Sequence, residues 1–165
     1  MKKIILIIAL IFTSNILLAQ GLFDKLEDLD EVSAVVVTKD AFELLKKFPD
    51  AASGDMEIFN TAKGLDELKV FSTKNTAVAA KMENMVTNAI KSENLTQLMR
   101  VTDEGTRSKI YVKPTKNADI VSEVLMFVKN NEKGSVANVS IISLTGLIDV
   151  NKLAKIANDY QKKSN

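Results

Sequence analysis

The sequence contains no cysteine, no histidine and no tryptophan, and these absences exclude several classes of chemistry. Without cysteine or histidine, the chain cannot form the usual structural zinc sites, a thiol nucleophile or a histidine-based catalytic triad. Disulfides cannot stabilise the fold, so the burial of apolar side chains has to do so. No pattern of the remaining residues predicts a catalytic group, a metal site or a cofactor site.

The first twenty residues have the pattern of a secretory signal peptide. Two lysines, Lys2 and Lys3, precede an apolar run over residues 4–18, and the small residue Ala19 follows that run. Cleavage at this point leaves a mature chain that begins at Gln20 or Gly21. The alternative is an uncleaved membrane anchor, because about 20 apolar residues are enough to cross a bilayer.

Export narrows the location and the partners of the mature chain. A bacterial lipoprotein needs a cysteine after the cut, so we expect a periplasmic or extracellular protein that carries no lipid and has no membrane span after cleavage. Loss of Lys2 and Lys3 changes the formal net charge from +1 to −1. This charge gives no electrostatic support to nucleic-acid binding. Residues 21–165 have the usual length of one domain.

Hydrophobic periodicity and turn residues predict helices and strands along this domain. The predicted helices cover residues 21–31, 41–48 and 76–91, and a last helix follows Asp149. The predicted strands cover residues 32–38, 65–73, 95–102, 107–113, 121–129 and 136–145.

Turn chemistry at residues 103–105 and 130–134 makes the last four strands two antiparallel hairpins. We therefore predict an α+β domain: a two-layer sandwich with a mostly antiparallel sheet and helices packed on one face. The expected core consists of Val36, Leu45, Val70, Met82, Val86, Ile110, Val112, Met126 and Ile141.

Four stretches of the chain resemble exported bacterial proteins of the domain of unknown function 4252 family. These stretches are VSAVVVTKDAFELLKKFP, LDELKVFST, LMRVTDEGTRSKIYVKP and IISLTGLIDVNKLAKIAN, with Gly146 and Asp149 in the last one. The resemblance implies an export signal and a single α+β domain, and it brings no activity or catalytic residues. Some members look like lipoproteins, from which this chain differs because it has no cysteine.

The first predicted hairpin gives the most specific surface. A two-residue or four-residue loop pairs Arg100 with Lys109 and Met99 with Ile110, so that Met99, Val101, Ile110 and Val112 point to the core. The opposite face then carries one aromatic and four basic side chains: Arg100, Arg107, Lys109, Tyr111 and Lys113. Two interpretations stay open, a binding face for an envelope protein or an anionic polymer and an ordinary solvated sheet face.

Three functional hypotheses follow. The first is a non-enzymatic interaction module of the cell envelope or periplasm. The second is a small carrier or sensor that binds an apolar ligand between sheet and helices, with Met82, Met85, Met99 and Met126 as an adaptable lining. The third is a hydrolase that uses only Asp, Glu, Ser, Lys or Tyr. The acidic run that starts at Asp24 lacks the glycine of a calcium loop, so we expect it to form a solvated helix face.

Overall fold

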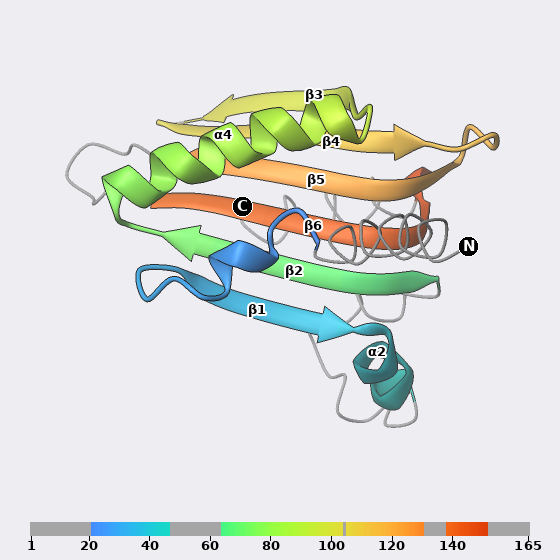
Figure 1. Cartoon of the computed structure of the whole chain (residues 1–165). Coiled ribbons are helices and arrows are strands. Elements are labelled where there is room, and N and C mark those ends of the chain that lie inside the picture. Colours follow the sequence, from blue (N-terminus) through green and yellow to red (C-terminus); the bar gives the residue numbers. More distant parts are fainter. Residues whose placement is uncertain (1–20, 47–63, 104, 131–137, 152–165) are drawn as a thin grey trace, which may run out of the picture.

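The computed structural model describes residues 21–46, 64–103, 105–130 and 138–151. Its centre is a six-stranded sheet with the order β1-β2-β6-β5-β4-β3, in which every neighbouring pair is antiparallel (Figure 1). The strands are β1 (Ser33–Thr38), β2 (Leu65–Thr73), β3 (Thr96–Asp103), β4 (Thr106–Pro114), β5 (Ile120–Asn130) and β6 (Asn138–Asp149). The helices with described bounds are η2 (Asp24–Leu26), α2 (Lys39–Lys46) and α4 (Thr76–Ser92). The fold is therefore α+β, as predicted.

Helix α4 lies diagonally across one face of the sheet (Figure 1). Its start is fixed by Asn75, whose side-chain oxygen accepts hydrogen bonds from the backbone N–H groups of Ala77 and Val78 at 2.9 and 3.1 Å. Its apolar stripe, with Met82 and Val86 at the centre, is buried in the main core cluster of the sheet. The predicted helix and its core stripe are confirmed.

The N-terminal segment forms only the short 3-10 helix η2, where the sequence predicted a longer amphipathic helix. Two side chains on either side of Asp24, Phe23 and Leu26, are buried in the same core cluster as the α4 stripe. The ring of Phe23 lies 6.4 Å from the ring of Phe71 on β2. This segment therefore packs on the face that α4 covers, and a single turn is enough to bury its two large side chains.

The opposite face of the sheet has a second, smaller apolar cluster. Its buried members are Val112, Val121, Val124 and Ile148. Ile110 and Leu144 pack against it and are half-buried. The sheet therefore buries apolar side chains on both faces. That all helices share one face stays a prediction, because the described contacts of α2 are with strands β1 and β2.

Several expected core residues are placed differently by the strand order. Val36 is exposed because β1 is an edge strand, and Val70, Ile110 and Met126 are half-buried. Met82, Val86, Val112 and Ile141 are buried as predicted. The side chain of Leu45 lies outside the described residues, and so do residues 47–63.

Strands β2 and β6 approach each other closely at two glycines. Gly64 and Gly146 both have positive φ values, +105° and +128°. The backbone N–H of Leu147 donates a hydrogen bond of 2.7 Å to the carbonyl oxygen of Gly64. A side chain at position 146 would meet the backbone of residues 64–66, so the close approach of the two backbones requires glycine at this position.

Two further observations concern the helices. The Asp149 carboxylate accepts a hydrogen bond of 2.9 Å from the backbone N–H of Asn151, as expected for a residue that begins a helix. Residues 152–165 of that predicted helix lie outside the described residues. Within the described ranges, no helix combines the length and the apolar character needed to cross a membrane.

Candidate interaction surface

The hairpin of β3 and β4 has the predicted register. Arg100 lies opposite Lys109 and Met99 opposite Ile110, and Asp103 pairs with Thr106, which leaves a two-residue connection. Gly105 in this connection has a φ of +92°, a conformation that glycine adopts without strain. The parity argument is therefore correct about which side chains share a face.

Four basic side chains gather near the turn of this hairpin, and we call them the basic corner: Arg100, Arg107, Lys109 and Lys129. Cross-strand partners point to the same face of a sheet. Arg100 pairs with Lys109 across β3 and β4, and Arg107 pairs with Lys129 across β4 and β5. Sequence analysis missed Lys129, because its place beside Arg107 depends on the pairing of β4 with β5.

Tyr111 and Lys113, which the sequence placed on the same basic face, have other surroundings. Tyr111 is only 9% exposed and belongs to the main core cluster, because α4 covers this part of the sheet face. Lys113 forms an ion pair of 2.6 Å with Glu93, the residue that follows α4. The five predicted residues therefore do not form one open basic patch, because the buried Tyr111 separates the ion-paired Lys113 from the basic corner.

The charges of the basic corner are only partly compensated. Lys129 forms an ion pair of 3.5 Å with Glu83 of α4. Neither Arg107 nor Lys109 forms an ion pair with any residue in the described ranges. Like charges in directly opposite cross-strand positions destabilise a sheet, so the fold gains nothing from this arrangement.

The reverse face of β3 is apolar instead of basic. Met99 and Val101 are 48% and 44% exposed, although parity correctly puts them on the face of Ile110. The prediction that they lie in the core is wrong because β3 is the outermost strand and the second cluster is centred on other strands. Within the described ranges no strand pairs with the outer edge of β3, which has a basic side and an apolar side.

A second group of charges surrounds the end of α4. Burial raises the pKa of Glu123, and the nearby Glu93 carboxylate raises it further. The hydrogen bond to Glu93 raises the pKa of Lys113. The ion pair with Glu93 accounts for the shift of Lys113, whereas the shift of Glu123 comes first from burial and is opposed by the nearby Lys113 cation. Among the described residues, no three acidic side chains come together in a way that could hold a metal ion.

The methionines of the carrier hypothesis do not line a common space. Met82 and Met85 pack in the cluster under α4, whereas Met99 and Met126 lie with Ile110 on the reverse face of the sheet. An open hollow of about 370 Å³ lies at the start of β1 and the end of β2, and seven of the eight residues that line it are polar or charged, among them Ser33, Ser72 and Thr73. These placements do not favour an apolar ligand between sheet and helices.

Comparison of the sequence with protein families gives a match over most of the chain. The family model of a domain of unknown function, DUF4252, matches residues 25–156. The chain belongs to the DUF4252 family. The match covers every strand of the sheet, helix α4 and the whole basic corner. No curated protein and no solved structure matches this DUF4252 protein.

Proposed function

We propose that this DUF4252 protein is an exported, non-enzymatic interaction module that binds an acidic segment of an envelope protein at the β3 edge. The observation that carries the proposal is the basic corner, where Arg107 and Lys109 lie beside other cations without an ion-pair partner among the described residues. Charges that do not stabilise a fold are candidates for recognition.

The edge of β3 supports binding of an extended segment. An edge strand has free N–H and C=O groups that can pair with an added strand. Side chains of an added strand alternate between the two faces. Acidic side chains would then face the basic corner, and apolar side chains in between would face Met99 and Val101. A partner segment with alternating acidic and apolar residues fits both sides.

The N-terminal pattern supports export. Residues 1–20 combine two lysines, an apolar run and a small residue in the order of a signal peptide. We propose that these residues are removed and that the mature protein acts in the periplasm or outside the cell. The intact mass of the exported protein tests this, since a full-length mass in the membrane fraction would indicate an anchored protein instead.

A double charge reversal tests the binding surface. In crosslinked cells, we expect Arg107→Glu with Lys109→Glu to reduce capture of envelope proteins at least about tenfold, because repulsion replaces attraction at the acidic segment. Binding by the parent should also weaken as salt rises, since exposed charges are screened beyond about 8 Å at physiological ionic strength. Capture is measured by quantitative mass spectrometry of the crosslinked partners.

The matched control reverses two exposed lysines elsewhere, Lys81 on α4 and Lys116 after β4, and changes the net charge by the same amount. Neither lysine forms an ion pair with a described residue. The control should capture partners as the parent does. Equal capture by all three proteins would show that the basic corner is an ordinary solvated surface, and an equal loss in both variants would show an effect of net charge alone.

A further inference from the structure

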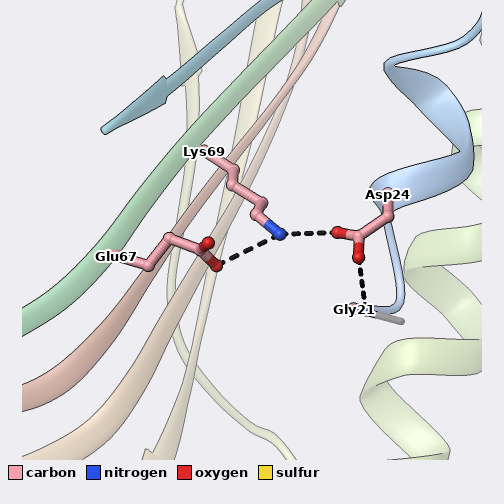
Figure 2. Close-up of polar contacts among 4 residues, drawn as sticks. All are labelled: Gly21, Asp24, Glu67 and Lys69. Atoms are coloured by element: carbon pink, nitrogen blue, oxygen red, sulfur yellow. Dashed lines mark hydrogen bonds and ion pairs between the residues drawn. The ribbon is translucent and has the colours of Figure 1, made fainter. Parts of the chain in front are cut away.

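The N-terminal segment is joined to the sheet by a chain of polar contacts that starts at Gly21 (Figure 2). The backbone nitrogen of Gly21 donates a hydrogen bond of 2.6 Å to one carboxylate oxygen of Asp24. The other oxygen lies 2.5 Å from the ammonium nitrogen of Lys69 on β2. The same ammonium lies 3.1 Å from the carboxylate of Glu67. We call these three charged residues the Lys69 network.

The Lys69 network has one negative charge too many. It joins two carboxylates to one ammonium group, and that ammonium is well protected, with 13% of the Lys69 side chain exposed. The hydrogen bond from Lys69 lowers the pKa of Asp24, so this carboxylate is charged at neutral pH. The Asp24 oxygen that does not contact Lys69 accepts the hydrogen bond from the Gly21 nitrogen, which is neutral in an intact peptide bond.

A side chain at position 21 would have to push the Asp24 carboxylate aside. A Cβ atom there would lie 2.7 Å from the Asp24 carboxylate oxygen and 3.1 Å from the Lys69 nitrogen. Real Cβ atoms essentially never come within 3.0 Å of a heavy atom outside their own residue and its chain neighbours, so a larger residue would displace the Asp24 side chain from Lys69. Glycine therefore allows the backbone nitrogen to reach the network.

We propose that the Lys69 network is the binding site of the mature amino terminus, whose ammonium group supplies the missing positive charge beside Asp24. This inference rests on the proposed removal of residues 1–20. A chain that begins at Gly21 places its ammonium at the nitrogen already bonded to Asp24. A chain that begins at Gln20 places it one residue away, at most about 3.6 Å farther along the backbone.

Processing then changes the electrostatics of the fold. Removal of the leader converts an uncharged backbone amide into an ammonium group. Four charged groups then alternate in sign, from the amino terminus through Asp24 and Lys69 to Glu67. The charged contact of the terminus holds the segment whose Phe23 and Leu26 side chains are buried in the same cluster as the apolar stripe of α4. The precursor cannot make this charged contact, so the processed chain is the form that the network fits.

Competitive labelling of the exported protein with an amine-reactive anhydride tests the proposal. An opposite charge within about 4 to 6 Å shifts a pKa by roughly one unit or more, so we expect the α-amino pKa to exceed its ordinary range of about 7.7 to 8.0. At neutral pH the terminus should then react about tenfold more slowly than the amino terminus of an unstructured peptide. Replacement Asp24→Asn should restore the ordinary rate, and Asp28→Asn, at an exposed position nearby, should not.

Intact mass measured on the same sample separates the outcomes. A mass that still includes residues 1–20 would overturn both the export proposal and this inference. A processed mass with an ordinary rate of labelling in the parent protein would leave export intact and overturn the inference. A chain that begins at Gln20 and has lost one ammonia, as a cyclised N-terminal glutamine does, would also overturn it, because no ammonium remains. Slow labelling that Asp24→Asn abolishes would support it.

Discussion

The Lys69 network and the basic corner both contain several charges on one face of the sheet, but they arrange them in opposite ways. In the network, Lys69 is shared between two carboxylates and is largely shielded from solvent. In the basic corner, like charges face one another across strands, and three of the four have no ion-pair partner among the described residues. The first arrangement stabilises the fold, whereas the second lowers its stability, which is why we assign binding to the second.

Loss of the central cation should have the largest effect. Replacement Lys69→Met keeps the apolar stem but leaves the Asp24 and Glu67 carboxylates without their shared partner. We expect a loss of about 2 kcal/mol in the free energy of unfolding, between the values for exposed and for fully buried ion pairs. Denaturant unfolding measures it.

The matched control is Lys39→Met, which removes the exposed ion pair of Lys39 with Asp66. The side chains of Lys39 and Asp66 are 62% and 58% exposed, so the loss in the free energy of unfolding should stay below about 1 kcal/mol. Equal losses in the two variants would show that the Lys69 network contributes no more than a surface pair.

The contribution of the Lys69 network to stability should decrease at both acidic and alkaline pH. The hydrogen bond from Lys69 lowers the pKa of Asp24 below its ordinary value of 3.8, so that part of the stability is present above this value and is lost as pH falls through the lowered pKa. Burial alone would lower the pKa of Lys69, but the hydrogen bonds to Asp24 and Glu67 raise it above 10.5. That part is present below 10.5 and is lost as pH rises through the raised pKa.

The difference in unfolding free energy between the parent and Lys69→Met should therefore be constant near neutral pH and shrink below about pH 4. Unfolding curves of both proteins from pH 2 to pH 9 would measure the acidic limb. A difference that stays constant over this range would show that Asp24 is not linked to Lys69 in solution.

Reversal of a single charge in the basic corner should have the smallest effect on stability, and it should stabilise the fold instead of destabilising it. Replacement Arg107→Glu puts an acid opposite Lys129 and beside Lys109, so we expect a gain of about 0.2 to 1 kcal/mol in stability together with weaker capture of partners. Replacement Arg107→Gln removes the charge without reversing it and should give an intermediate value. A loss of stability on reversal would mean that Arg107 has a structural role.

Local patterns in the sequence were enough to predict most elements and one register. The strand predicted over residues 65–73 is β2 with its observed bounds, and the two-residue or four-residue loop predicted around Gly105 gave the observed Arg100 to Lys109 pairing. Parity says which side chains share a face, but it does not say which face a helix covers. For that reason Tyr111 was expected in solvent and Met99 in the core, and both predictions were wrong.

Contacts between distant parts of the chain had no local signal. Asp24 and Lys69 are 45 residues apart, and nothing near Asp24 distinguishes it from its acidic neighbours, which were expected to be solvated together. The exposure of Val36 follows from the position of β1 at the edge of the sheet. The exposure of Val36 depends on the strand order, and the contact of Asp24 with Lys69 depends on how the N-terminal segment packs on the sheet, so neighbouring residues predict neither feature.

The position of β6 also has a consequence for how the chain folds. Strand β2 ends at Thr73 and β6 begins at Asn138, yet they are neighbours at the centre of the sheet. During synthesis, β1 and β2 therefore emerge long before the strand that joins them to the β3–β5 meander. Because a pairing over such a sequence distance forms slowly, we expect the sheet to remain open until the C-terminal part of the chain is complete. We expect a chain with this topology to fold more slowly than one built from local hairpins alone, and slow folding would suit the export that we propose.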